Sequence, residues 1–392
     1  MTNTSDNRFQ YMKKSILLLL GSLLFAGCVC NQGVSFPQGQ LPYDNPYAFG
    51  HDLSFVLSAE KRGGVWYDTD GTQMSPWEIF RSHGYNWGRL MICNEPSRLG
   101  QTLDYVLEGA QKLKENNTHF ALDFMMADGW SNPMTQPTPS SMKDMTHQER
   151  VTAFYDYVHH VIATLRDAGV QPELVQVGNE ISNGAFWPTG RIYYGEEKRD
   201  QSRWKEFTDY IKAGIKAIRD VDPAIQVMLH LDFGGDLEMS EIFFTKMQEY
   251  KVVYDCIGFS FYPWSHGTLM DLRDNLYYVI EKFRKPVYVI ETGFYSVPSQ
   301  YFERKGLRAP FPETPEGQKQ WFQAVNEIVM AAPYNLGRGV FWWEPMQRGR
   351  GCFDDQTHVA KPILEAFEQY AYPLQRTDGN PRIWDFEEGE RP

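Results

Sequence analysis

Cysteine is scarce in this chain: five of its 392 residues are cysteines, and none stands in a spacing typical of metal ligands. We therefore predict neither a bound metal ion nor another cofactor. Cys93 and Cys256 lie far apart, within apolar stretches of the sequence. Cysteines in such surroundings behave as small buried side chains, so we expect free thiols rather than disulfides.

Positive charge and long apolar runs are also in short supply. Lys and Arg number 38 against 50 Asp and Glu, which gives a net charge of −12. This balance argues against nucleic acid or an anionic membrane surface as a partner. The apolar run from Ile16 to Ala26 is shorter than the about 20 residues that cross a bilayer. No long tract is low in complexity, so disorder is not expected outside the ends.

The amino-terminal region has the features of a secretory signal. Lys13 and Lys14 precede the apolar run, which ends in Leu24-Phe25-Ala26-Gly27-Cys28 and resembles a bacterial lipobox. We therefore expect residues 1–27 to be a signal peptide, with Met12 as an alternative start. Cys28 would then carry a lipid, and the product would be an exported bacterial lipoprotein of the outer membrane. Its lipid would be its only membrane contact, at the cell surface or at the periplasmic face.

Aromatic residues are plentiful by contrast. The chain has 11 Trp, 22 Tyr and 25 Phe, which together make up 15% of its residues. Rings beyond the needs of a core often line sites for flat apolar or sugar faces. A large core with surplus tyrosine is the alternative interpretation.

Short apolar runs alternate with helical patterns over most of the chain, after an aperiodic tether at residues 28–47. Runs buried on both faces and separated by helices predict a single (β/α)8 TIM barrel over residues 48–375, followed by a tail at 376–392. A doubly wound sheet is the alternative, but Ser58-Ala59-Glu60 stands where its glycine-rich phosphate turn would be. The expected strands are Leu53–Leu57, Trp87–Ile92, Phe120–Met125, Leu174–Val177, Gln226–Leu231, Cys256–Phe261, Val287–Ile290 and Gly339–Trp342. The expected helices are Pro76–His83, Leu103–Asn116, His147–Ala168, Arg203–Val221, Leu237–Tyr250, Thr268–Phe283 and Pro315–Ala331.

Polar and aromatic residues gather at the carboxyl ends of the expected strands. In a barrel of this kind these ends form one face, and active sites are built there. A purely structural barrel would not need such residues at that face. They are Arg89, Asn94 and Glu95; Asp123, Asp128 and Trp130; Asn179 and Glu180; His230 and Asp232; Tyr262, Trp264 and His266; Glu291; and Trp343 and Glu344.

Two of these acids, Glu180 and Glu291, end the fourth and seventh strands, which face each other across a closed barrel. Retaining glycoside hydrolysis needs two carboxyl groups about 5–5.5 Å apart, one a nucleophile and one an acid and then a base. Arg89 could keep the nucleophile ionised, whereas burial and a second carboxylate would raise the pKa of the acid. Asn179 is placed to hydrogen-bond a sugar hydroxyl.

Each residue also has a structural interpretation when it is taken alone. Glu180 or Glu291 could be an ordinary acid after a strand, and Arg89 could be an ion-pair partner. His230 could be a satisfied interior histidine, and Trp343 could belong to the core. Only their convergence on one rim favours a site.

These residues lie in motifs that resemble glycoside hydrolase family 53, the arabinogalactan endo-β-1,4-galactanases. The matching stretches run in order from residue 50 to residue 354, and include Asn86-Trp87-Gly88-Arg89-Leu90, Asp128-Gly129-Trp130, VQVGNEISNGAFWP, His266-Gly267-Thr268 and Trp343-Glu344-Pro345. The resemblance implies an endo-acting, retaining hydrolase of β-1,4-galactan, the side chains of pectin. It implies Glu180 as acid/base and Glu291 as nucleophile, with Asn179, Arg89, His230 and Tyr262 as supports. It also implies contacts to the polysaccharide from Asp123, Asp128, Trp130, Trp187, His266 and Trp343.

The chain departs from the family pattern at a few positions. Met125-Met126 replaces His-Tyr after the third strand, Trp264-Ser265 replaces Tyr-Trp, and Met346-Gln347 stands where a second Trp is usual. A structural calcium known in some members is not predicted, because the loop after the seventh strand offers only Glu303. A relative acting on another β-linked polysaccharide, or an inert glycan-binding lipoprotein, is therefore kept as an alternative. The oligomeric state is not predicted.

Overall fold

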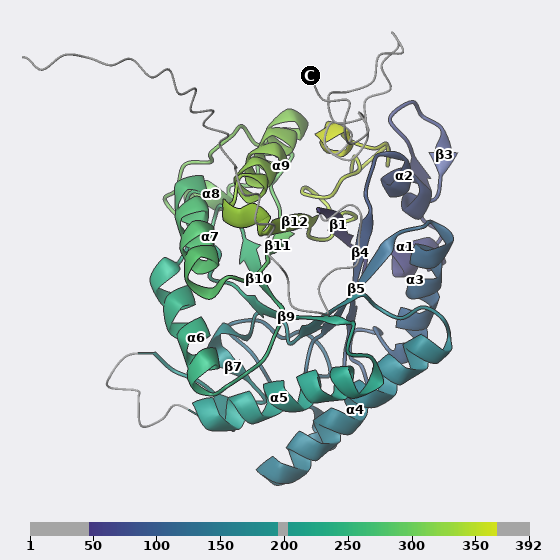
Figure 1. Cartoon of the computed structure of the whole chain (residues 1–392). Helices are drawn as coiled ribbons and strands as arrows, with labels where there is room; N and C mark the ends of the chain where they lie inside the picture. Colours follow the sequence, from purple (N-terminus) through teal and green to yellow (C-terminus); the bar gives the residue numbers. More distant parts are fainter. Residues whose placement is uncertain (1–46, 195–202, 367–392) are drawn as a thin grey trace, which may run out of the picture. The chain divides into compact units, whose positions relative to one another are not determined.

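A computed structural model describes residues 47–194 and 203–366. The predicted signal peptide, Cys28, most of the tether and the carboxy-terminal tail lie outside these residues. Eight parallel strands close into a barrel with helices around it, as Figure 1 shows, so the predicted (β/α)8 fold is confirmed and the doubly wound sheet is not. In order around the barrel the strands are β1 (Ala48–Asp52), β12 (Gly337–Trp342), β11 (Val287–Thr292), β10 (Cys256–Phe261), β9 (Gln226–Leu231), β6 (Leu174–Val177), β5 (His119–Phe124) and β4 (Trp87–Ile92).

The long helices agree with the predicted ones to within one residue at each end. They are α2 (Pro76–Ser82), α3 (Leu103–Glu115), α4 (His147–Asp167), α5 (Trp204–Val221), α6 (Leu237–Glu249), α7 (Leu269–Phe283) and α9 (Pro315–Met330). Threonine side chains cap four of them, including Thr314, which accepts from the backbone of Gly317 at the start of α9. None of the helices in the described ranges is long and apolar enough to cross a membrane.

The segments outside these strands and helices contain smaller elements. They are the helices α1 (Val56–Lys61) and α8 (Tyr301–Arg304), the hairpins β2 (Trp66–Tyr67) with β3 (Gln73–Met74) and β7 (Gly184–Ala185) with β8 (Gly190–Arg191), and the 3-10 turns Ser140–Met142, Ile181–Asn183, Pro333–Asn335 and Pro362–Leu364. Cys93, Cys256 and Cys352 are buried free thiols, as expected for the first two.

The predicted first strand, Leu53–Leu57, is wrong. The strand lies just before it, at Ala48–Asp52, and Val56 and Leu57 begin α1. Its five residues are all buried although two of them are His51 and Asp52. The apolar run that follows packs as a turn and a helix, because Leu53 donates its backbone N–H to Arg89 and then leaves the sheet.

Every second side chain of a strand faces into the barrel, so the inward-facing side chains form successive layers. An apolar inner layer contains Trp87, Ala121, Leu174 and Met228 together with Ala48, Cys256, Tyr288, Ile290 and Phe341. Two positions further along their strands, on the same inward face, stand Arg89, Asp123, Gln176 and His230. Asp52 and Ser260 stand on the same face four positions after Ala48 and Cys256. All six of these polar side chains are buried. A polar layer therefore lies on an apolar one, toward the face where active sites are built.

Glu291 joins this polar layer through an irregularity in β11. The strand register shifts between Phe259 and Ser260 against β10, and between Val289 and Thr292 against β12. An extra residue in a strand changes which side chains face inward beyond it. Glu291 thus points into the barrel, one position after Ile290 of the apolar layer.

Candidate active site

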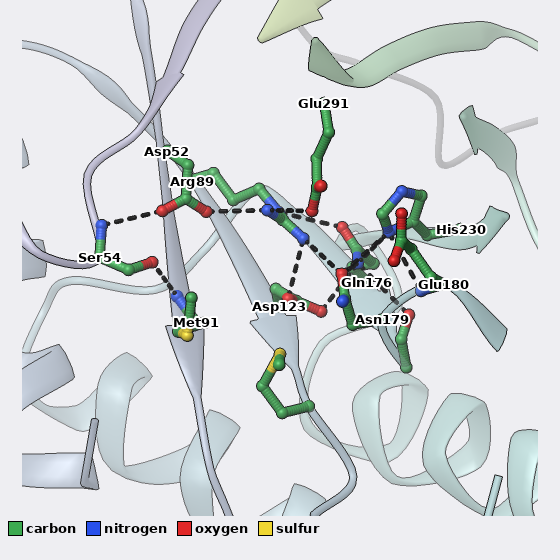
Figure 2. A network of polar contacts seen from close by, with 12 residues as sticks. Asp52, Ser54, Arg89, Met91, Asp123, Gln176, Asn179, Glu180, His230 and Glu291 are labelled. Atoms are coloured by element: carbon green, nitrogen blue, oxygen red, sulfur yellow. Dashed lines mark hydrogen bonds and ion pairs between the residues drawn. The ribbon is translucent and has the colours of Figure 1, made fainter. Parts of the chain in front are cut away.

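Arg89 is the centre of the polar layer, as Figure 2 shows. Its side chain is 1% exposed, and its Nη1 atom lies 2.8 Å from Asp52 Oδ2 and 2.9 Å from Glu291 Oε1. Its Nη2 atom donates to Asp123 Oδ2 at 2.9 Å and to Asn179 Oδ1 at 3.0 Å. A guanidinium presents five donors in a fixed fork, which suits it to hold several acids at once. Arg89 therefore fixes groups from four strands in one geometry.

Glu291 is the acid of the candidate pair that lies against the cation of this network, and its pKa is raised above the ordinary value. Burial raises the pKa of its carboxyl group, and the positive charge of Arg89 acts in the opposite direction. The Tyr262 hydroxyl donates to Glu291 Oε2 at 3.0 Å, which also favours the anion. Its two oxygens therefore face a cation on one side and a hydroxyl donor on the other.

Glu180 has the opposite surroundings. It follows Gly178 at the end of β6 with φ of 45° and ψ of 55°, a left-handed conformation that is strained for glutamate. Burial raises the pKa of its carboxyl group well above the ordinary value, and the negative charges of Glu291 and Asp232 act in the same direction. Glu180 is thus the member of the pair whose pKa is raised more strongly.

The polar layer is held together by hydrogen bonds of three side chains, those of Asn179, Gln176 and His230. Gln176 accepts from Arg89 Nε at 3.2 Å through Oε1, so its Nε2 faces His230 Nδ1 at 2.8 Å. We assign Nδ1 as an acceptor from this contact, which leaves the proton on Nε2. Burial lowers the pKa of His230 well below its usual value, and the nearby charge of Arg89 adds to this effect, so the ring is neutral. Asn179 is held on its other side, where Nδ2 donates to the carbonyl of Ser131 at 2.8 Å.

Asp123 and Asp128, predicted to bind substrate, both accept hydrogen bonds from within the protein. Asp123 is fully buried, and its two oxygens accept from Gln176 and Arg89. Burial raises the pKa of Asp123 to about 7. Asp128 accepts from the backbone N–H of Ser140 with both oxygens and so holds the loop after β5. Their positions argue for holding Arg89 and this loop, because the carboxylate oxygens already have partners.

The predicted aromatic contacts differ in how open they are. Trp130 is 43% exposed, and its ring lies 6.1 Å from that of Trp343. Trp343 is largely buried and also lies 5.5 Å from the guanidinium of Arg89. Trp187 has one face covered by Arg191 at 4.2 Å. Together Trp130 and Trp343 give the site a corner of two rings beside Arg89.

His266 supports Tyr262 from the backbone. Its Nδ1 atom accepts from the Tyr262 backbone N–H at 3.0 Å, and burial lowers its pKa to about 4. The Tyr262 ring in turn stacks on Trp264 at 5.2 Å. This group positions the hydroxyl that faces Glu291.

A cavity of about 420 Å³ opens beside the polar layer. Asp52 and Glu344 line it, together with Phe55, Trp66, Met346, Gln347, Arg348, Phe353 and other residues of the loops after β1 and β12. Glu344 has a φ of 46°, and its nearest cation is Arg350 at 3.8 Å. Burial raises the pKa of Glu344 to about 7. Acidic and aromatic walls of this kind suit a ligand rich in hydroxyl groups.

The chain departs from the family pattern at Met125 and Met126, directly after β5. Both side chains are buried, and Met126 packs against Gly178 just before the Asn179-Glu180 pair. Ser131 donates its hydroxyl to the Met125 carbonyl, which ties the loop after β5 to the strand. Apolar side chains here support the turn that carries Glu180.

A lysine side chain joins the loops after β11 and β12. No group of three or more His, Cys, Asp or Glu side chains within residues 47–194 and 203–366 could hold a metal ion. The ammonium group of Lys361 joins these loops through Ser296 Oγ at 2.9 Å and the Gly351 carbonyl at 3.1 Å.

The structure adds three residues that were not assigned a role from the sequence: Gln176, Ser260 and Asp52. Ser260 lies between His230 and the two glutamates, with Oγ 2.9 Å from His230 Nε2. A signal was present for two of them, because Gln176 lies three positions before Asn179 and Ser260 lies two positions before Tyr262. The polar period of the strands could have identified them.

Comparison with known proteins agrees with this geometry. Residues 48–366 match the model of glycosyl hydrolase family 53. An uncharacterised protein of Niallia circulans is 35% identical over 77% of this chain and 84% of its own length. An arabinogalactan endo-β-1,4-galactanase of Cellvibrio japonicus is 29% identical over 87% of this chain and 89% of its own. The solved family 53 catalytic domain of Ignisphaera aggregans matches with a TM-score of 0.75 at 25% identity, covering 82% of this chain and 95% of that domain. The resemblance found in the motifs is confirmed, and the chain belongs to glycosyl hydrolase family 53.

Proposed function

We propose that this protein is an endo-acting, retaining galactanase that cleaves β-1,4-galactosidic bonds in galactan and type I arabinogalactan. The observation that carries the proposal is the asymmetry of the two acids. Glu291 faces the cation of Arg89, whereas Glu180 is desolvated beside other acids. One ionised and one protonated carboxyl group are what the retaining reaction requires. The galactanase name of the Cellvibrio japonicus relative supports the choice of polymer.

In the first step the Glu291 carboxylate attacks the anomeric carbon of one galactosyl unit. The bond to the glycosidic oxygen breaks, and Glu180 gives its proton to that oxygen, so the rest of the chain leaves with a hydroxyl group. In the second step Glu180, now a carboxylate, takes a proton from water. The water oxygen attacks the same carbon and releases the Glu291 carboxylate, so the product keeps the β configuration.

The supporting residues act on charge and position. Arg89 and the Tyr262 hydroxyl keep Glu291 ionised and fix its direction. Asn179 is held by Arg89 and by the Ser131 carbonyl beside Glu180, where its amide group can reach the 2-hydroxyl of the sugar. Trp130, Trp343 and Trp187 provide faces for the rings of the polymer, and the cavity at Glu344 would take a neighbouring unit.

The experiment is an assay of the purified protein on linear β-1,4-galactan, with the anomer of the first product followed by NMR. We expect galacto-oligosaccharides with the β anomer first. Product from mannan or a β-glucan, with none from galactan, would replace the substrate by another β-linked polysaccharide. Binding to galactan without turnover, unchanged in Glu291→Gln, would make the protein an inert glycan binder.

Glu180→Gln tests the acid role within the same assay. It should lose most of its activity on the polymer but keep more on an aryl galactoside whose leaving group needs no proton. Equal losses on both substrates would contradict the assignment of Glu180.

We propose, from the sequence, that the protein is an outer-membrane lipoprotein anchored through Cys28. Labelled palmitate should be incorporated into the expressed wild-type chain and not into Cys28→Ala. Equal labelling of the two chains would contradict the anchor.

A further inference from the structure

Ser260 stands where the two glutamates and His230 meet. Its Oγ atom is fully buried, 2.9 Å from His230 Nε2 and 3.4 Å from Glu291 Oε2. The carboxyl group of Glu180 is also within hydrogen-bond reach of this hydroxyl, and the contact lowers the pKa of Glu180. One hydroxyl group therefore faces both carboxyl groups of the proposed reaction.

The hydrogen atoms at this junction can be assigned. His230 Nδ1 faces the Gln176 amide donor, so the ring proton lies on Nε2 and points at Ser260. Ser260 Oγ accepts that proton and keeps one hydrogen of its own to donate. With a single donor and two carboxyl acceptors, Ser260 can serve only one glutamate at a time.

We propose that the Ser260 hydroxyl is a positioning group that follows the negative charge between Glu291 and Glu180 during the reaction. In the resting enzyme Glu291 is ionised, and Ser260 donates to it. After Glu291 forms its ester with the sugar, that oxygen is a weak acceptor and Glu180 carries the charge. The hydroxyl then turns about its Cβ–Oγ bond and donates to Glu180, while no covalent bond is made or broken. This inference rests on the proposed double-displacement function.

The geometry favours rotation over a fixed bond. The Ser260–Glu291 distance of 3.4 Å is long for a hydrogen bond to a carboxylate, which is ordinarily about 2.5–2.7 Å. The shorter contact to His230 holds the oxygen in place as an acceptor. A donor that is anchored through its oxygen and loosely bound through its hydrogen is free to change partner.

The test removes this hydrogen and follows each step separately. Ser260→Ala should raise the pKa of whichever carboxyl group loses its donor, because a hydrogen bond to the anion stabilises the charged form. The acidic limb of kcat/KM on galactan reports the ionisation of Glu291 in the free enzyme. The acidic limb of kcat on a dinitrophenyl β-galactobioside, for which hydrolysis of the ester is slow, reports Glu180 as base. Both limbs should move upward by about one to two pH units, since a hydrogen bond to a charged group is worth roughly that.

The alternatives give different results. A fixed bond to Glu291 would move only the galactan limb, and a role limited to packing His230 would lower the rates and move neither limb. Either result would overturn the inference. Failure of the wild-type protein to cleave galactan would overturn the proposed function instead.

Other charges that face the pair stay constant in this comparison: Asp52, Arg89, Asp123, Asp232, Tyr262 and Glu344. Thr292→Val is the matched control, because it removes a buried hydroxyl beside Glu291 that bonds the Phe261 carbonyl and Trp321. It should lower stability without moving either limb. Ser260→Cys keeps the volume with a weaker donor, and it replaces Ser260→Ala if that variant does not fold. Its limbs should move upward together by a smaller amount, and unmoved limbs would again overturn the inference.

Discussion

Replacing Arg89 by methionine should both unfold and inactivate the enzyme, in a manner that depends on pH. The guanidinium is buried and lies within 2.9 Å of Asp52, Asp123 and Glu291. Removal of one partner from a buried ion pair costs about 3–5 kcal/mol, because the other charge is left without compensation. We expect Arg89→Met to lose about 4 kcal/mol of unfolding free energy at pH 7.

The loss should shrink as the pH falls. The folded-state pKa values of the three carboxyl groups already lie above their unfolded values near about 4, and they should rise further without Arg89. Groups shifted upward contribute stability below the unfolded pKa and lose it as the pH rises through the folded pKa. Asp123 already has a pKa of about 7 with Arg89 present. The window therefore runs from about pH 4 to above pH 7, and the variant should approach the wild type toward its acidic end.

Removal of Arg89 should also lower the activity, because Glu291 must be ionised to act as the nucleophile in the proposed reaction. A neighbouring cation lowers a carboxyl pKa by about 1–3 units, so the loss of Arg89 should raise the pKa of Glu291 by that amount. We expect the acidic limb of kcat/KM to move upward by about 1–3 pH units, so that kcat/KM falls about 10- to 1,000-fold at pH values below the wild-type limb and by less at pH 7. Arg89→Lys keeps a charge but not the fork, and should fall between the two.

Urea unfolding at pH 5 and pH 7, together with pH–rate profiles on galactan, measures both effects. Arg219→Met is the control, because Arg219 pairs with Asp255 near the surface, away from the polar layer. It should lose about 1–2 kcal/mol and leave the profile unchanged. An equal loss for Arg89→Met at both pH values, or an unmoved acidic limb, would refute the reasoning.

Two further variants test the acid and the cavity. Asp232→Asn removes a negative charge that raises the pKa of Glu180, so the basic limb of kcat/KM should move to lower pH by about half to one unit; an unmoved limb would mean that Asp232 does not act on Glu180. Glu344→Gln removes an ionisable group whose pKa is raised to about 7, so KM for galactan should rise about tenfold above pH 7 while kcat changes less than about twofold; an unchanged KM would exclude the cavity from substrate binding.

Much of the fold could be predicted because barrel strands and helices differ in period and length. Trp87–Ile92 and Gln226–Leu231 were predicted with the right bounds, since both are short apolar runs. The first strand was misplaced because Ala48–Asp52 includes His51 and Asp52, whereas the apolar residues that follow belong to a turn and a helix. Polar side chains that face into a barrel weaken the very pattern by which its strands are found.

The site could be predicted in its residues but not in its connections. Arg89, Asn179, His230, Glu180, Tyr262 and Glu291 all stand at strand ends, and the structure brings them together. Which carboxylate Arg89 holds depends on strand register, which places Asp123 against its guanidinium. The inward turn of Glu291 depends on an irregularity in β11 that no periodic pattern reveals.

These connections explain why one arginine serves three acids. A cation paired with Glu291 alone would neutralise it, and the buried pair would gain little after desolvation. Asp52 and Asp123 instead share the guanidinium and satisfy its other donors. Asp52 raises the pKa values of Glu291 and Asp123, against the effect of Arg89 on both groups. The charges of Glu291 and Asp232 add to the effect of burial on Glu180, so its pKa is raised further, as the proposed role of Glu180 as proton donor requires.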